Sequence, residues 1–119
     1  MILVDTSVWV EHLRRGEPEL VRLLDGREVL GHPLVIGELA MGNLHGRAAR
    51  LTDLRNLPRA VVATDAEVLG LVEREALHGS AIGYADACLL AAARLTPGGQ
   101  LWTLDRRLAD VAARMAVAR

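Results

Sequence analysis

Residues 1–14 read MILVDTSVWVEHLR, and this stretch indicates a buried strand followed at once by a helix. The run Ile2–Val4 is apolar without polar alternation, which is typical of a strand covered on both faces of a parallel sheet. Residues 5–7 (Asp, Thr and Ser) then supply helix-capping chemistry, and apolar residues recur at nearly helical spacing from Val8 onward. A buried strand that leads directly into a capped helix favours an α/β fold.

The same alternation continues along the sequence. We expect strands at 1–4, 28–32, 60–63, 101–104 and 115–118, and helices that begin near residues 5, 17, 33, 46, 64, 84 and 106. Thr64 and Glu67 have the spacing of a capping box, and the second helix carries an apolar stripe of Leu20, Leu23 and Leu24. Alternating strands and helices predict a central parallel sheet with helices on both faces, in a single domain over residues 1–119.

The composition indicates a folded protein but does not indicate its function. Of the 119 residues, 51% are hydrophobic and the mean hydropathy is +0.22, which excludes a disordered chain. The formal net charge of −1 neither supports nor excludes a nuclease, because a nuclease with several acidic metal ligands can be neutral overall and still present a basic face.

The sequence also suggests a cellular compartment. Cys88 is the single cysteine, so no intramolecular disulfide can form, which favours a reducing environment. No signal peptide precedes Asp5, and the longest apolar stretches, 29–36 and 87–93, fall well short of the roughly 20 residues that a membrane helix needs. We therefore expect a cytoplasmic protein with no membrane contact.

Two aspartates directly follow predicted strands, Asp5 after residues 2–4 and Asp105 after residues 101–104. In a parallel α/β sheet, functional sites form at the carboxyl ends of the strands, so both positions are candidates for a site. Each aspartate also precedes a helix, and helix capping is the alternative role for either one taken alone.

Two further acids, Glu38 and Asp86, lie in apolar stretches of sequence, so we expect both to be at least partly buried. A buried carboxylate without a partner costs several kcal/mol, so it needs a compensating charge. An ion pair with an arginine is one alternative. Four acids with no lysine in the chain are better explained by a divalent cation, and oxygen ligands suit Mg²⁺ or Mn²⁺ rather than zinc.

Four segments of the chain together resemble the PIN domain family. The segments MILVDTSVWVEHLR (1–14), VIGELAMG (35–42), GYADACLLAAA (83–93) and LWTLDRRL (101–108) look like those that hold the first to the fourth acid of that family. Their order and spacing match over essentially the whole chain, and its small size points to the VapC-like bacterial toxins. Asp86 lacks the proline that often precedes it in the family, which leaves the start of its helix open.

The resemblance implies a PIN-like three-layer α/β/α fold and a metal-dependent endoribonuclease, the toxin of a VapBC-like toxin–antitoxin module. Carried over position by position, it implies that the catalytic and metal-binding acids are Asp5, Glu38, Asp86 and Asp105. It also implies that the groups orienting these carboxylates or a water are Thr6, Ser7 and Thr103. A homodimer, an RNA substrate and a cognate antitoxin are the partners that it implies.

The expected antitoxin contact rests on the apolar composition of the chain. We expect a helix of the antitoxin to lie along the first two helices, over Leu20 and Leu24, with an arginine or lysine among Asp5, Glu38 and Asp86. Such a basic side chain would compete with Mg²⁺ for the same acids.

Several arginines are candidates for holding the RNA backbone, with a solvated helix face as the alternative for each group. These candidates are Arg14 with Arg15, the set Arg47, Arg50 and Arg55, and Arg106 with Arg107. Trp9, Trp102 and Tyr84 are expected in the core or at its rim, and Cys88 as a small packed hydrophobe.

The absence of lysine excludes two rival enzyme classes with aspartates at strand ends. Response-regulator receivers and haloacid-dehalogenase-like phosphatases both use a lysine to neutralise a phosphoryl group, and this chain has none. A Gly-Lys-Ser/Thr phosphate-binding loop is absent as well. Two alternatives stay open: a catalytically silent nucleic-acid-binding module of the same fold, and a PIN nuclease of RNA processing outside a toxin–antitoxin pair. Cleavage of DNA also stays open.

Overall fold

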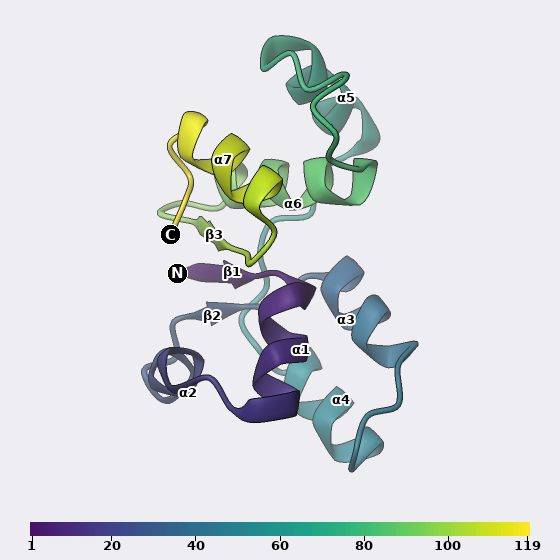
Figure 1. Cartoon of the computed structure of the whole chain (residues 1–119), viewed down its shortest axis with the longest axis vertical. Coiled ribbons are helices and arrows are strands. Elements are labelled where there is room, and N and C mark those ends of the chain that lie inside the picture. Colours follow the sequence, from purple (N-terminus) through teal and green to yellow (C-terminus); the bar gives the residue numbers. More distant parts are fainter.

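A three-stranded parallel sheet forms the centre of the computed structural model, which describes residues 1–119 (Figure 1). Strand β1 (Ile2–Val4) lies between β2 (Val29–Leu30) and β3 (Gln100–Trp102). All residues of β1 and β2 are buried, as expected for strands covered on both faces. The predicted α/β class with a central parallel sheet is therefore confirmed.

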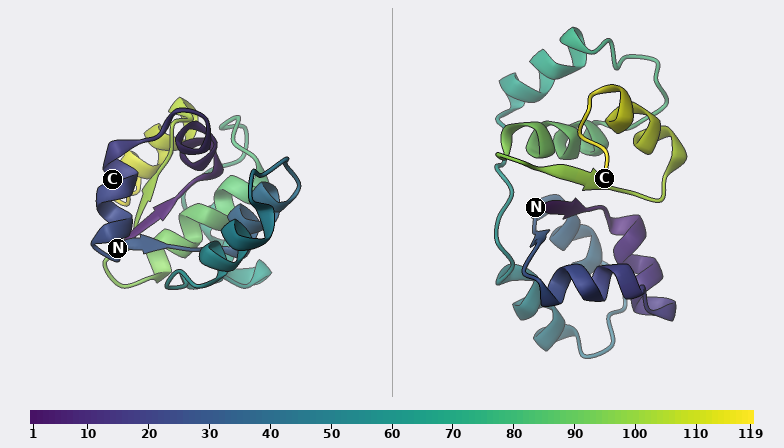
Figure 2. Two further views of the ribbon diagram at one scale, coloured as in Figure 1. Left: turned by 90° about the horizontal axis from the view of Figure 1, so that it is seen from below. Right: turned by 90° about the vertical axis from the view of Figure 1, so that its left-hand side faces the viewer.

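Seven helices enclose this sheet. They are α1 (Thr6–Arg15), α2 (Pro18–Asp25), α3 (Pro33–Ala40), α4 (Arg47–Arg55), α5 (Asp65–Arg74), α6 (Tyr84–Leu95) and α7 (Arg106–Arg114). Helices α1 to α4 lie on one side of the strands and α5 to α7 on the other, as both Figure 1 and the right-hand view of Figure 2 show. The arrangement is the predicted three-layer α/β/α fold. None of the seven helices has the length and apolar character that crossing a membrane would require.

The strand predicted at 60–63 is reduced to one bridge at the edge of the sheet. Arg59 pairs with Gly31 as an isolated parallel bridge. The ladder stops there because the next free donor, the N–H of Val61, donates to Thr96 Oγ1 at 2.9 Å instead of to a strand. The predicted strand at 60–63 therefore does not form, and the bridge lies at Arg59, one residue before it.

The strand predicted at 115–118 is likewise a single bridge, on the other edge, between Ala118 and Leu101. The chain turns at Ala116, whose φ of +60° lies in the left-handed region. This turn after α7 uses up most of the predicted strand. Only the last few residues remain to hydrogen-bond with β3.

Local sequence signals mark the helix ends as predicted. Helix α5 begins with a capping box, in which Glu67 N–H donates to Thr64 Oγ1 at 3.1 Å and Thr64 N–H donates to Glu67 Oε1 at 2.9 Å. Helix α1 ends at Gly16, whose φ of +77° is readily adopted only by glycine. Helix α2 has Pro18 in its first turn, where a missing N–H costs nothing.

Helix α6 packs against β1 and β3 and supplies much of the core. Its buried residues are Ala87, Leu89, Leu90, Ala91, Ala92 and Ala93. Four of these six are alanines, so the helix backbone can approach the sheet closely. The small side chains therefore set the distance between this helix and the sheet.

Helix α2 buries two of the three leucines in its predicted apolar stripe. Leu20 and Leu23 are 0% and 1% exposed and belong to the core, whereas Leu24 is half-buried. The expectation that an antitoxin contacts Leu20 is wrong, because this side chain faces the protein interior. Leu24 lines an apolar cavity of about 150 Å³ between α1, α2 and α4.

Both tryptophans and the cysteine lie in the core or at its rim, as predicted, whereas Tyr84 does not. Trp9 is buried, and Trp102 is half-buried against the core. Tyr84 is half exposed at the start of α6. Cys88 is half-buried and packs on the core as a small apolar side chain.

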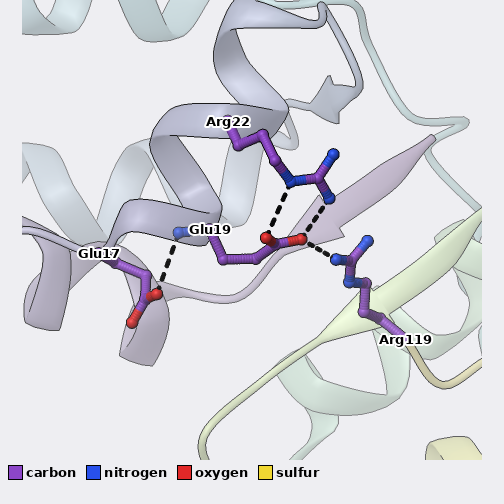
Figure 3. A network of polar contacts seen from close by, with 4 residues as sticks. All are labelled: Glu17, Glu19, Arg22 and Arg119. Atoms are coloured by element: carbon purple, nitrogen blue, oxygen red, sulfur yellow. Dashed lines mark hydrogen bonds and ion pairs between the residues drawn. The ribbon is translucent and has the colours of Figure 1, made fainter.

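A cluster of charged side chains ties α2 to the far edge of the sheet (Figure 3). Glu19 accepts hydrogen bonds from Arg22 Nη2 at 2.6 Å and Arg22 Nε at 3.0 Å, and it also pairs with Arg119. The guanidinium of Arg119 in turn lies 5.9 Å from the ring centre of Trp102 in β3. The hydrogen bond from Arg22, followed by the positive charges, lowers the pKa of Glu19 despite some desolvation. The cluster thus joins segments from both ends of the chain.

Replacing Leu20 with alanine tests its place in the core. We expect Leu20→Ala to lower the free energy of unfolding by about 2–5 kcal/mol, because it removes a fully buried side chain and leaves a cavity. Val21, the next residue, is 44% exposed, so Val21→Ala should change stability by only about 0.5 kcal/mol or less. Urea unfolding of both variants measures the difference, and equal midpoints would contradict this assignment of the helix face.

Candidate active site

Asp5 follows β1, and its side chain is held by two hydroxyl groups rather than by the helix that follows. The side chain is buried, with 9% exposed. Its Oδ2 accepts hydrogen bonds from Ser7 Oγ and Thr103 Oγ1, both at 2.7 Å. It makes no capping hydrogen bond to α1, so the capping alternative does not apply to Asp5. Its other oxygen, Oδ1, carries no hydrogen bond and is available to a ligand.

The two hydroxyls also anchor the segment that follows β3. Ser7 Oγ accepts from the N–H of Leu104 and Thr103 Oγ1 accepts from the N–H of Asp105, each at 3.0 Å. Each hydroxyl has a single proton, and Asp5 accepts both, so the 3.3 Å approach of the two oxygens is a contact and not a further hydrogen bond. Ser7 and Thr103 therefore connect the position of Asp5 to the loop that carries Asp105.

Asp105 caps a helix with its side chain, which is the alternative role that the sequence left open for it. Its Oδ1 accepts hydrogen bonds from the N–H groups of Arg107 at 2.9 Å and Leu108 at 3.2 Å, in the first turn of α7. The Oδ2 atom makes no hydrogen bond within the protein. Capping thus fixes the side chain of Asp105 and leaves one of its oxygens free.

Asp86 lies in the first turn of α6, which begins at Tyr84 after the N-cap Gly83. Burial is the largest cause that raises the pKa of Asp86 above its usual range, and the negative charges of Asp5, Asp105 and Glu38 raise it further. A hydrogen bond from Gly83 N–H at 3.2 Å acts in the opposite direction. The other three carboxylates therefore lie near enough to Asp86 for their charges to act on it.

Glu38 lies on α3, and its exposure differs from the burial that its apolar neighbours in the sequence predicted. Its side chain is exposed, because α3 buries Val35 and Leu39 and turns Glu38 toward solvent. The predicted burial of Glu38 was therefore wrong. The alternative of an ion pair with an arginine also fails, because the four ion pairs of the structure include neither Glu38 nor Asp86.

Thr6 does not contact a carboxylate, unlike the other two hydroxyl residues expected to do so. It is the first residue of α1, and its Oγ1 is buried without any hydrogen-bond partner. Its side chain lines a cavity together with Glu38. The hydroxyl of Thr6 thus makes no hydrogen bond to a carboxylate, and its predicted role of orienting a carboxylate or a water stays a prediction.

The four carboxylates form an acidic cluster (Asp5, Glu38, Asp86 and Asp105) that has no arginine paired to any member. No three His, Cys, Asp or Glu side chains of the chain converge closely enough to enclose a metal ion. Like charges repel, and a divalent cation bound among these carboxylates would offset that repulsion. The all-oxygen donor set and the uncompensated negative charge fit a hard cation such as Mg²⁺ or Mn²⁺.

His32 is a residue near the site that sequence reasoning missed. It follows β2, is 2% exposed, and caps α3 by accepting a hydrogen bond from Leu34 N–H at its Nδ1 (3.1 Å). Burial is the main cause that lowers its pKa, and the charge of Arg59 adds to this. Because α3 carries Glu38, the cap formed by His32 helps to position one acid of the cluster. The only sequence signal was its place directly before Pro33, since histidine is not among the preferred capping residues.

Comparisons with known proteins match nearly the whole chain. The PIN domain family profile matches residues 2–114, a range that includes the whole acidic cluster. The chain is 49% identical over 118 residues to "Ribonuclease VapC32" of Mycobacterium tuberculosis, in both strain CDC 1551 / Oshkosh and strain ATCC 25618 / H37Rv. The match covers 99% of this chain and 95% of that protein. No solved structure gives a significant match.

Removing one hydroxyl tests the support of Asp5. We expect Thr103→Val to lower the free energy of unfolding by about 1–3 kcal/mol, because a hydrogen bond to a buried carboxylate is lost at nearly constant volume. Thr103→Ser keeps the hydroxyl and should retain most of that stability. Urea unfolding measures both variants. If valine and serine give the same loss, the methyl group and not the hydroxyl stabilises this position.

Proposed function

The chain belongs to the PIN domain family, and from this premise we propose that it is a metal-dependent endoribonuclease that acts as the toxin of a toxin–antitoxin pair. The observation that carries the proposal is that Asp5 and Asp105 meet at the carboxyl ends of β1 and β3 and are linked there through two hydroxyl groups, with no arginine paired to either. Asp86 lies close enough for their charges to act on it. The name of the similar mycobacterial protein supports RNA as the substrate. The homodimer and the cytoplasmic location belong to the same proposal.

The side chains that would hold Mg²⁺, or Mn²⁺ as the alternative, are Asp5, Glu38, Asp86 and Asp105. When bound, such an ion supplies an acidified water for in-line attack on phosphorus and neutralises charge on the phosphate oxygens. The chain itself supplies orientation. Ser7 and Thr103 fix one oxygen of the Asp5 carboxylate and leave the other free, and the first turn of α7 does the same for Asp105.

The apolar cavity between α1, α2 and α4 supports a revised position for the antitoxin. Its apolar lining residues are Trp9, Leu13, Leu24, Leu44, Leu54 and Leu57. We infer that an apolar helix of the antitoxin covers this cavity, with Leu24 replacing Leu20 as the contact on α2. A basic side chain from the same partner would be attracted to the acidic cluster and would compete there with Mg²⁺.

Metal-dependent RNA cleavage tests the enzymatic part of the proposal. We expect cleavage of total RNA in Mg²⁺ and a higher Tm in Mg²⁺ or Mn²⁺, because the ion relieves repulsion within the acidic cluster. Asp5→Asn and Asp86→Asn should each abolish the Tm response and lower the cleavage rate about a hundredfold or more. Asp110→Asn, at an exposed position on α7 outside the cluster, is the control. A wild-type Tm that ignores metal, without cleavage, would favour the catalytically silent module.

Growth of a bacterial host tests the toxin part separately. Expression without the antitoxin should arrest growth, because an unrestrained ribonuclease degrades RNA that the host needs. Asp5→Ala should relieve the arrest while circular dichroism shows that the protein is still folded. Cleavage in vitro without growth arrest would instead favour a role in RNA processing, and arrest by Asp5→Ala would show that the acid is not the cause.

A further inference from the structure

A cavity of about 350 Å³ lies beside the acidic cluster, between α1, α3 and the start of α4. Glu38 belongs both to the wall of this cavity and to the cluster, so the cavity adjoins the place where the acids meet. The other polar residues in its wall are Thr6, Arg14, Asn43, His45 and Arg50. Its volume is that of a site for a small ligand or for one unit of a polymer.

We propose that this cavity binds the nucleotide next to the scissile phosphate. Arg14 and Arg50 hold the phosphate of that nucleotide, and Thr6 and Asn43 contact its base. The cavity would then select the sequence at the cut. This inference rests on the proposed function, since it takes the acidic cluster as the place of RNA cleavage.

The charges in the wall favour a phosphate. Neither Arg14 nor Arg50 is in an ion pair, so both guanidinium groups keep their charge available for a ligand. Arg50 Nε donates to the carbonyl of His45 at 2.8 Å, which holds this guanidinium at the cavity wall. Two unpaired arginines outweigh the one carboxylate of Glu38, so the cavity has the opposite sign of charge from the cluster beside it.

The remaining wall suits a base. Val10, Leu13, Leu39 and Leu44 supply apolar surface against which a base can lie. Thr6 Oγ1 is a buried polar atom with no partner inside the protein, which is uncommon in folded proteins. A base edge offers donors and acceptors to such a hydroxyl and to the amide of Asn43. Single-stranded RNA is commonly read by contacts of this kind.

The neighbouring apolar cavity makes the assignment specific. Six of the nine residues that line the smaller cavity are hydrophobic, against four of the eleven that line the larger one, which also holds Arg14, Asn43 and His45. Arg50 lies in the wall of both. We therefore assign the smaller cavity to the protein partner and the larger one to the substrate, and Arg50 lies between them.

Matched arginine variants test the phosphate contact. The probe is a fluorescein-labelled single-stranded RNA pool of random sequence, used for both cleavage in Mg²⁺ and binding by anisotropy. Arg14→Ala and Arg50→Ala should each raise KM and Kd about tenfold with a smaller change in kcat, because one charge-assisted contact is lost. The slope of log Kd against log salt should fall by about 0.7 for each arginine.

The controls are arginines on the same helices that lie outside the cavity. Arg15 pairs with Glu11 at 3.4 Å on α1, and Arg55 is exposed at the end of α4. The sequence made Arg15 and Arg55 candidates for the RNA backbone too, but neither lines the cavity, so Arg15→Ala and Arg55→Ala should raise KM and lower the salt slope less than Arg14→Ala and Arg50→Ala do. All four positions are exposed, so an unchanged Tm will show that the variants are folded.

Sequencing the cut ends tests the base contact. Thr6→Val and Asn43→Ala should change the nucleotide preference at one position beside the cut, whereas a purely structural effect would change the rate alone. The inference is overturned if wild type cleaves and the Arg14 and Arg50 variants keep its KM and salt slope. If wild type does not cleave, the proposed function fails. RNA binding then tests the cavity by itself. Weaker binding by the Arg14 and Arg50 variants than by the controls supports the inference that the cavity binds RNA, and equal binding by all four variants overturns it.

Discussion

The parallel pairing of β1 with β3 is the contact on which the rest of the structure depends. It brings Asp5 beside Thr103, 98 positions away in sequence, and Asp5 N–H extends the ladder by donating to Trp102 O at 2.9 Å. Closing so long a loop has an entropic cost that only the core can offset. Helix α6 covers both strands and supplies apolar surface at this pair. Without the pairing, neither the support of Asp5 nor the approach of Asp86 would exist.

The acidic cluster works against this stability. Asp86 is half-buried beside three other carboxylates, and both its burial and their charges raise the free energy of its ionised form. The structure limits that cost through the hydroxyls on Asp5, the helix turn that receives Asp105, and the exposure of Glu38. Functional sites are the places where proteins commonly retain such unfavourable arrangements, because a ligand relieves them.

Much of the fold could be predicted because its signals are local. An apolar run followed by Asp5 marks a buried strand and the helix after it, and the Thr64 box marks a helix start. The rotation of a helix about its axis is not local, since it depends on what packs against it. For that reason the sequence did not reveal that Leu20 faces inward or that Glu38 faces solvent. The cavity beside the cluster likewise depends on how three helices meet, and Asn43 gave no signal of its own.

The alanines of α6 make this part of the core more sensitive to larger side chains than to smaller ones. In most of a core, removing methyl groups is the damaging change, because it leaves empty space. At the buried alanines of α6, adding them would be the damaging change, since a larger side chain would have to displace the elements packed against that helix. Asp86 stands in the first turn of the same helix, so an enlarged side chain about one and a half to two turns further on would displace a carboxylate that it never touches. The spacing between α6 and the sheet thus fixes the position of Asp86. Substitutions in this part of the core are therefore limited by their effect on the acidic cluster.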